Sequence, residues 1–414
     1  MDLPGMVLVR QHPSQEPLAD PPAAVLYEMQ AFRDRIRPGA RICLAVGSRG
    51  ISRLPELVKA IIDALRSFGA DPFIIPAMGS HGGATAAGQA ELLQGLGVTE
   101  VEVGAPIHSA MDVVQVGRLD TLPVFCDRLA AAADGLLLLN RIKPHTDFRG
   151  RLESGISKML VVGVGKHEGA IALHQHGMRG LRELIPQAAL LAAGATPFWG
   201  GIAVVENSDG DPAIIRAVAV ADFLASEEQL LSKARALMPR LPCDALDVLI
   251  VERMGKDISG TGMDPNVIGR LGIIGEAGFE SPRIGRIVVL DLTDQSHGNA
   301  LGIGLADFTT RRLVRKIDQA STYENALTST FVDRAKVPLT AANDLEAIGM
   351  ALRTVWRPRQ EITLARIAGT HRLGALEVSD NLLPLLERRT DLTVVQTGRR
   401  LEFSRSGDLL PLQW

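Results

Sequence analysis

Residues 41–83, RICLAVGSRGISRLPELVKAIIDALRSFGADPFIIPAMGSHGG, decide the fold class of this chain. They begin with an apolar run that enters a glycine-containing loop, and they end with a second run and loop of the same kind. Between the two, residues 54–68 carry apolar side chains at helical spacing, with Pro55 near the start and Gly69 as a stop. A strand, a helix and a strand in this order predict a parallel sheet in an α/β fold.

The alternation of strands and helices extends through most of the chain. Residues 135–145 (GLLLLNRIKPH) form another apolar strand that runs into a polar loop, and residues 245–255 (ALDVLIVERMG) start a second series after the prolines near residue 240. We therefore predict two α/β domains, 1–240 and 241–414, with mostly parallel sheets and an interdomain cleft that holds a ligand. The first 30 residues predict a short strand followed by proline-rich coil.

Composition narrows the classes of partner. Apolar residues make up 46% of the chain and charged residues 22%, and the net charge of -3 provides no basic face for nucleic acid. The three cysteines are far apart and lie within or beside apolar runs, which argues against a disulfide framework or a cysteine-based metal site. Because we find no signal-peptide pattern and no apolar run of the roughly 18 residues that a membrane span needs, we expect a cytoplasmic protein without a membrane partner.

Polar loops follow three of the predicted strands, and ligands of open α/β sheets bind beyond such strand ends. The loop Gly47–Ser52 places Ser48 and Arg49 at the start of a helix, where free N–H groups favour a phosphate or carboxylate; a turn with a capped helix explains the same residues. The loop Met78–Thr85 surrounds His81 with glycines, which suits either a general base that a ligand approaches closely or a structural loop histidine.

The third loop opens the stretch from residue 141 to residue 176, RIKPHTDFRGRLESGISKMLVVGVGKHEGAIALHQH. His145 suits proton transfer near neutral pH, and Arg149 suits an anionic ligand. Lys158 lies among small residues, where its amine can reach a carbonyl and become covalently attached. His174 ends an apolar helical run and is a candidate metal ligand, although a zinc site built by protein alone needs three or four ligands that the spacing does not supply. The alternative is a polar loop of solvated charges.

Two glycine-rich loops in the second half carry further candidates. Residues 254–266 (MGKDISGTGMDPN) contain Lys256, which could hold a carboxylate, and residues 294–299 (DQSHGN) contain His297. Both loops follow predicted strands, so we expect ligand contact from either, while ordinary connecting loops remain the alternative.

Together, these stretches resemble the nickel-dependent lactate racemase family over most of the first domain. The sequence Gly-Ser-His at 79–81 is similar to the loop of the family's first catalytic histidine, and Pro-His at 144–145 to that of the second. Residues 154–158 (SGISK) resemble the segment whose lysine is linked to a nickel-pincer nucleotide, a modified pyridinium mononucleotide. The resemblance thus implies His81 and His145 as catalytic residues and Lys158 as the site of cofactor attachment.

Further positions resemble the metal-binding, cofactor-binding and substrate-binding residues of the family. His174, 16 residues after Lys158, falls where the family has its nickel-ligating histidine. The pair at 48–49 looks like a Thr-Arg pair of the cofactor and substrate region, and Lys256 is similar in placement to a substrate-binding lysine of the second domain. The resemblance implies a first domain that binds cofactor and performs the chemistry, a second domain that closes the substrate cleft, and accessory enzymes that synthesise the cofactor.

Departures from the family pattern concern the substrate pocket. Val46 stands where the prototype has an acidic residue, the GSHGG loop differs from a His-Arg pattern, and only Trp356 offers itself as a substrate-packing tryptophan. The additional groups Arg149, Lys256 and His297 favour a larger or more anionic substrate. The resemblance therefore implies a 2-hydroxy acid other than lactate.

The chemistry implied by the resemblance is the inversion of a 2-hydroxy acid centre by reversible hydride transfer. One histidine takes the hydroxyl proton, and the other returns a proton from the opposite face. Two other interpretations stay open at this point: a hydrolase or lyase that uses His81 and His145 with an ordinary divalent metal, and a non-catalytic module that binds a nucleotide. The sequence does not specify the oligomeric state.

Overall fold

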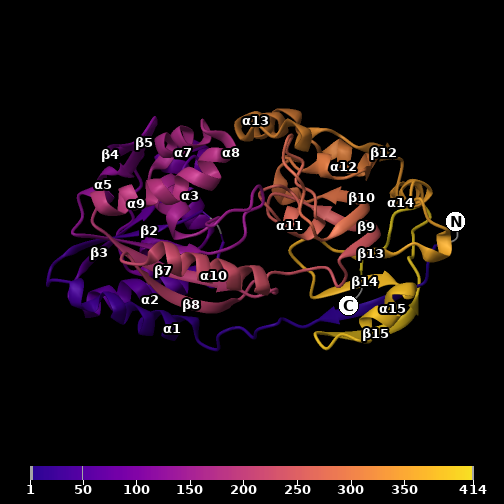
Figure 1. Ribbon diagram of the computed structural model, residues 1–414, viewed down its shortest axis with the longest axis horizontal. Coiled ribbons are helices and arrows are strands. Elements are labelled where there is room, and N and C mark those ends of the chain that lie inside the picture. The colour runs from indigo at the N-terminus through magenta and orange to yellow at the C-terminus, as the bar shows by residue number, and fades with distance from the viewer. Residues whose placement is uncertain (1–2, 49, 413–414) are drawn as a thin grey trace. The chain divides into compact units, whose positions relative to one another are not determined.

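The computed structural model describes residues 3–48 and 50–412 and divides the chain into two compact units (Figure 1). One unit is Gln15–Met238. The other joins Pro239–Trp414 to the segment that ends at Ser14. Both units combine largely parallel sheets with helices, so the predicted α/β class is confirmed.

The first strand does not belong to the unit in which the sequence placed it. We expected residues 1–240 to form one domain, but β1 (Met6–Gln11) pairs antiparallel with β14 (Ala375–Ser379) and β15 (Leu392–Arg399) of the other unit. Its first four residues are buried there and fill the sheet between those two strands. A pairing between opposite ends of the chain leaves no local pattern in the sequence, so the hydrophobic run alone could not locate its partner.

The unit Gln15–Met238 is built on a five-stranded sheet of order β3-β2-β6-β7-β8. The first four strands are parallel and β8 is antiparallel to β7. Side chains of β2 alternate between two cores: Cys43 and Ala45 point into one, Ile42 and Leu44 into the other. Helices cover both faces, because a parallel sheet must bury both. The strands are β2 (Arg41–Val46), β3 (Asp71–Pro76), β6 (Gly135–Arg141), β7 (Phe198–Glu206) and β8 (Pro212–Ala219).

Several helices of this unit begin at a side-chain cap or a proline. Asp20 caps α1 (Pro21–Glu28) by accepting from the Ala23 N–H, so part of the proline-rich segment expected to be coil is helical. The two-stranded hairpin β4 (Val113–Leu119) and β5 (Leu122–Asp127) lies outside the main sheet. The other α-helices are α2 (Leu54–Ser67), α3 (Ala86–Gly95), α4 (Glu100–Val103), α5 (Arg128–Ala131), α6 (Ile156–Lys158), α7 (Lys166–His174), α8 (Gly177–Arg179), α9 (Ile185–Ala195) and α10 (Phe223–Leu237).

The second unit contains an eight-stranded sheet of order β12-β11-β10-β9-β13-β14-β1-β15. The strands from β12 to β13 are parallel, and the last three pairings are antiparallel. Two cores again lie on the two faces, one including Leu249 and Val251 and the other Val248 and Ile250. The further elements are β9 (Ala245–Met254), α11 (Pro265–Ile268), β10 (Arg283–Leu292), β11 (Phe308–Thr310), α12 (Arg311–Lys316), α13 (Gln319–Ser329), β12 (Leu339–Ala341), α14 (Asp344–Arg353), β13 (Leu364–Ile367) and α15 (Leu383–Leu386).

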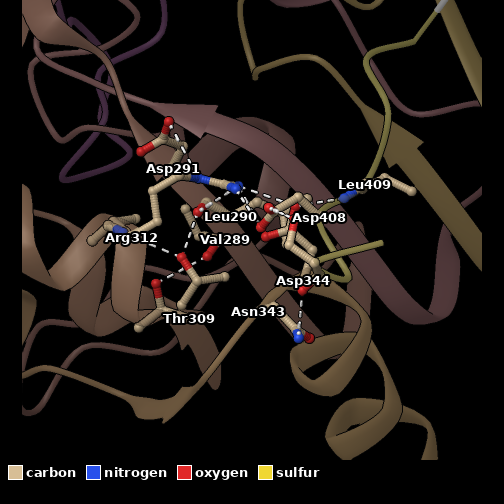
Figure 2. A network of polar contacts seen from close by, with 12 residues as sticks. Val289, Leu290, Asp291, Thr309, Arg312, Asn343, Asp344, Asp408 and Leu409 are labelled. Carbon is tan, nitrogen blue, oxygen red and sulfur yellow. Dashed lines mark hydrogen bonds and ion pairs between the residues drawn. The ribbon is translucent and has the colours of Figure 1, made fainter. Parts of the chain in front are cut away.

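A polar network joins the C-terminal segment to the helices of this second unit (Figure 2). Arg312 of α12 donates to Asp344 at 2.9 and 3.0 Å and to Asp408 at 2.9 Å. Asp344 also accepts from the Leu409 N–H at 2.8 Å. Burial raises the pKa of Asp344, and the Arg312 guanidinium opposes that rise. The network therefore depends on Arg312 to compensate a buried carboxylate.

No helix in the described ranges has the length and apolar composition to cross a membrane.

Candidate functional site

The three loops predicted to bind a ligand lie at one edge of the five-stranded sheet. Strands β2, β3 and β6 are neighbours and parallel, so their carboxyl ends meet there. Ser48 follows the first strand, His81 the second and His145 the third. The structure thus brings together loops that are separated by up to about 100 residues in sequence, as the strand pattern predicted.

Ser48 and His81 form a direct contact between the first two loops. The Ser48 hydroxyl hydrogen-bonds with Nδ1 of the His81 ring. Behind this histidine, the fully buried amide of Gln89 donates to the carbonyl oxygens of Gly79 at 2.9 Å and His81 at 3.3 Å. Gly82 adopts a φ of 66°, and a side chain there would meet the backbone of Gly88 at 2.5 Å. The loop therefore holds His81 in a fixed place while leaving the ring exposed.

The His81 loop packs directly on the segment that follows Lys158. That segment is a π-helix over Met159–Gly163, an uncommon form that is frequent at functional sites. Gly79 donates its N–H to the Gly163 carbonyl at 3.3 Å. A side chain on Gly163 would come within 2.7 Å of the Ala77 carbonyl, so the glycine permits this close approach.

A buried ion pair lies between the end of β3 and the start of α7. The Lys166 ammonium lies 3.1 Å from Asp127 Oδ2 and donates to the Pro76 carbonyl at 2.5 Å. Both charged side chains are fully buried. Lys166 also holds a positive φ of 55°, which is strained for a side chain of its size. It connects the end of β3, which leads to His81, with the start of α7, which ends at His174.

A buried carboxylate shapes the loop that carries His145. Glu153 accepts from the N–H groups of His145 at 2.6 Å and Gly150 at 3.1 Å. It also forms an ion pair with the Arg235 guanidinium, at 2.6 Å. The loop is closed at its base by the backbone pair of Lys143 and Ser154. Glu153 therefore provides the acceptors that backbone N–H groups of this loop need, and it keeps His145 in place.

His145 contacts the predicted attachment site directly. Its Nε2 lies 2.5 Å from the Lys158 Nζ, and its Nδ1 accepts from the Asp147 N–H at 3.1 Å. The Phe148 ring packs against the imidazole with a centroid distance of 4.5 Å. The predicted catalytic histidine and the predicted attachment lysine are thus hydrogen-bonded to each other, although 13 positions separate them in the sequence.

A second buried carboxylate supports the turn that presents Lys158. Glu227 of α10 accepts from the Ser157 N–H at 2.8 Å and from its hydroxyl at 2.6 Å. Gly155 is needed there, because a side chain would meet Glu227 Oε1 at 2.1 Å. Burial raises the pKa of Glu227 to about 7, and the two hydrogen bonds from Ser157 limit that rise. This carboxyl therefore titrates near neutral pH directly behind Lys158.

His174 is the last residue of α7, as the sequence predicted, and it is exposed in part. Partial desolvation lowers the pKa of its imidazole, the charge of Lys158, when protonated, lowers it further, and Asp147 opposes both effects. The lowered pKa favours the neutral imidazole, which is the form that binds metals. No group of three metal-ligating side chains is found among the described residues.

The other predicted site residues have different surroundings. Arg149 donates to the His145 carbonyl at 3.0 Å and lies 3.7 Å from Glu153, so it also supports the loop. In the second unit, the Lys256 ammonium donates to Asn325 Oδ1 at 2.7 Å, and His297 adopts a left-handed conformation with φ 47°. Arg49 lies outside the described residues. Trp356 is 97% exposed, which does not fit a substrate-packing role within its unit.

The sequence interpretation missed the buried acids that support the site. Glu153 was overlooked within the stretch that supplied His145 and Lys158. Glu227 carries a clearer signal, because it lies on the same helix face as the buried residues Leu230 and Leu231, where a charge is unexpected. A carboxylate on an apolar helix face predicts a buried hydrogen-bonded role.

Comparison with known proteins gives a similarity in structure and none in sequence. No protein-family model and no curated protein matches the chain. The chain is similar to the structure of the lactate racemase apoprotein from Thermoanaerobacterium thermosaccharolyticum, with 13% sequence identity and a TM-score of 0.48 over 81% of this chain and 84% of that chain. A similarity of this size carries no argument about activity, which must be judged from the residues themselves.

Proposed function

We propose that the chain is a racemase or epimerase of a 2-hydroxy acid that uses a nickel-pincer nucleotide attached at Lys158. One observation carries the proposal: the Lys158 amine lies 2.5 Å from the His145 imidazole at the carboxyl edge of the sheet. A lysine beside a base is suited to covalent attachment, and a histidine beside the attached group is suited to proton transfer. The sequence resemblance to the lactate racemase family supplies the identity of the group.

The donor set of this site fits the proposed cofactor. Lys158 offers an amine for attachment, and His174, whose pKa is lowered chiefly by desolvation, offers a neutral imidazole. Imidazole is a suitable ligand for nickel. When bound, the group would supply the other nickel ligands and a ring that accepts a hydride. Ser48 at the neighbouring loop would provide a hydroxyl donor for the nucleotide or the substrate.

Two histidines would handle the substrate's hydroxyl proton. Ser48 holds Nδ1 of His81, so proton exchange with a ligand would fall to Nε2 of that ring. His145 can use Nε2 only after the Lys158 Nζ has moved away, which covalent attachment of Lys158 would bring about. Each positioned base contributes a factor of about 10²–10⁴ in rate. Arg149, on the loop that carries His145, is the proposed partner of the substrate carboxylate.

The test uses the full chain made in a host that synthesises the pincer nucleotide. Intact mass should show one adduct that maps to Lys158, and metal analysis should show nearly one nickel per chain. The loaded protein should then be given enantiopure 2-hydroxy acids that carry deuterium at C2. Inversion that retains the deuterium would support hydride transfer, because hydride returns to the same carbon.

Two results would contradict the proposal. If the chain from this host carried no adduct, the proposed cofactor attachment would be wrong. If inversion exchanged the deuterium with solvent, the reaction would proceed by proton abstraction instead. Lys158→Arg is the matched control, because it keeps a cation but cannot form the same linkage. That variant should carry no adduct and should leave every substrate unchanged.

A further inference from the structure

A cavity of about 620 Å³ lies at the outer edge of β8 in the unit Gln15–Met238. Residues of α1 and α10 form its walls, and β8 lies between these two helices (Figure 1). This volume is within the range of small-molecule sites. The cavity contains none of the residues assigned above to the proposed reaction. It is therefore a second candidate site with its own chemistry.

The floor of the cavity presents backbone groups of an edge strand. Strand β8 pairs with β7 on one side only, and in an antiparallel pair every second residue directs its N–H and C=O away from the partner. Ala217 is one of these residues, because its N–H binds a side chain outside the sheet. Ile215, two positions earlier, therefore faces the same way, and so does Ala213, whose carbonyl accepts from a side chain outside the sheet.

Two side chains already form hydrogen bonds with outward backbone groups of β8. Glu28 accepts from the Ala217 N–H at 2.8 Å, and Gln15 donates to the Ala213 carbonyl at 2.9 Å. Between them, the Ile215 carbonyl accepts from the Arg216 guanidinium at 3.3 Å. In the described part of the chain, the Ile215 N–H has no acceptor outside the sheet. A buried N–H without an acceptor is unfavourable, so the position suits a ligand oxygen.

The charges around this N–H favour an anion. Glu28 is neutralised by Arg216, whose guanidinium lies 2.8 Å from its carboxylate. Lys233 of α10 also lines the cavity, and none of the described acidic groups forms an ion pair with it. The lining therefore carries one positive charge in excess. The carboxylate of Glu28, bound to the N–H of Ala217, shows how the outward edge of β8 holds such a group.

The rest of the lining is apolar. Leu18, Ala24 and Leu237 contribute hydrocarbon surface beside the charged groups. A ligand that fits must bury an apolar part there and keep its charge near Lys233. An added peptide strand fits less well, because Gln15 and Glu28 already occupy the edge on both sides of Ile215.

We propose that this cavity binds a small carboxylate with an apolar chain. One carboxylate oxygen accepts from the Ile215 N–H, the other faces the Lys233 ammonium, and the chain lies against Leu18, Ala24 and Leu237. The proposal is independent of the reaction at Lys158, because the cavity shares no residue with that site. Binding can therefore be tested on the full chain without any cofactor.

The test compares three probes by calorimetry and ligand-observed NMR: hexanoate, acetate and 1-hexanol. Hexanoate should bind one site per chain with a Kd of about 1–20 mM, as expected for a ligand of this size. Acetate and 1-hexanol should each bind at least about fivefold more weakly, because each lacks one half of the recognised chemistry. Equal binding of hexanoate and 1-hexanol, or no saturable binding of hexanoate by about 50 mM, would overturn the proposal.

Two variants locate the binding. Ala236→Phe should fill the cavity and weaken hexanoate binding more than about tenfold. Ala225→Phe places the same ring on α10 outside the lining and should leave hexanoate binding unchanged. Lys233→Gln should weaken hexanoate binding about three- to fivefold, because an exposed ion pair contributes about this much. Lys59→Gln on α2 should leave hexanoate binding unchanged. Unchanged affinity in both Ala236→Phe and Lys233→Gln would place hexanoate elsewhere and contradict the site.

Discussion

The Lys158 Nζ lies 2.5 Å from the His145 Nε2, while the Nδ1 of the same ring accepts the Asp147 N–H at 3.1 Å. A neutral imidazole carries one proton, and an Nδ1 that accepts a hydrogen bond leaves that proton on Nε2. The Nε2–H then points at the lysine nitrogen, which can accept it only as a free amine. The hydrogen bonds of His145 therefore favour an uncharged, nucleophilic Lys158.

The first prediction is selective labelling of Lys158 in the cofactor-free protein. A free amine forms an imine with an aldehyde at neutral pH, and reduction by cyanoborohydride fixes it. Lys158 should be modified at least about tenfold faster than the exposed Lys59, which is paired with Asp63. Peptide mapping after short exposures measures both rates in one sample.

His145→Gln tests whether the histidine is responsible for this reactivity. The amide can turn its oxygen to the lysine and accept from an ammonium, so it no longer favours the free amine, and the labelling of Lys158 should fall towards that of Lys59. His108→Gln is the control, because that ring packs on Phe73 rather than on a lysine. Equal labelling of Lys158 and Lys59 in the unaltered protein would show that Lys158 is charged.

Glu153 should be essential for the shape of the His145 loop. Glu153→Ala leaves the N–H groups of His145 and Gly150 without this acceptor and removes the ion pair with Arg235. We expect a loss of about 3 kcal/mol in the free energy of unfolding, measured with urea, because breaking a buried charged hydrogen-bond set costs this much. Amide exchange between Lys143 and Ser154 should also accelerate.

The matched change for Glu153 is Glu228→Ala. That carboxylate contacts Arg151 at the surface, with both side chains about half exposed. Removing it should change stability by less than about 0.5 kcal/mol. Equal effects of the two substitutions would contradict the structural role of Glu153.

The sequence predicted the loops of the site better than the supports beneath them. Strand ends and glycines identified His81 and His145 because both signals are local. The contacts of Lys158 with His145, of Glu227 with Ser157 and of Lys166 with Asp127 depend on how distant elements pack, which no spacing within one segment specifies. For the same reason the hydrophobic run of β1 indicated a strand but not its unit.

Arg312 should matter more for stability than its partial exposure suggests. Arg312→Met leaves Asp344 buried without its cation, and Asp344 is only 1% exposed (Figure 2). We expect a loss of about 2 kcal/mol, less than for a fully buried pair because the Arg312 side chain is 37% exposed. Arg311→Met, its exposed neighbour, should change stability by less than about 0.5 kcal/mol.

A double substitution separates the charge from the packing in this network. Asp344→Asn removes the uncompensated carboxylate, so adding it to Arg312→Met should restore part of the lost stability. Thermal and urea unfolding of the single and double variants provide the measurement. If the double variant were as unstable as the sum of the two single ones, the charge argument would be wrong.

The histidines of the proposed active site should separate into two roles. His174→Ala should lose nickel while the adduct at Lys158 remains, because only the metal depends on that imidazole. His81→Ala or His145→Ala should retain both nickel and adduct and lose turnover by a factor of about 10² or more. Intact mass, metal analysis and chiral chromatography distinguish the cases. Normal turnover in both latter variants would exclude the two-base mechanism.

Glu227 should make stability depend on pH near neutrality. Its pKa rises from an ordinary 4.5 to about 7 in the folded chain, chiefly through burial. The folded state therefore holds this proton more tightly than the unfolded state does. The contribution of Glu227 to stability is fully present below about pH 4.5 and is lost as pH rises through about 7. Between these values the free energy of unfolding should fall by about 3 kcal/mol from this group alone.

Glu227→Gln removes that dependence while retaining an oxygen that can accept from Ser157. The variant should lose most of the decline between pH 5 and about 7.5, and it should be the more stable protein at the upper end of that range. Urea unfolding at several pH values measures the slopes of both proteins. Glu228→Gln, its exposed neighbour on α10, should keep the original slope. An unchanged slope in Glu227→Gln would mean that the carboxyl behind Lys158 is already ionised in the folded protein throughout this range.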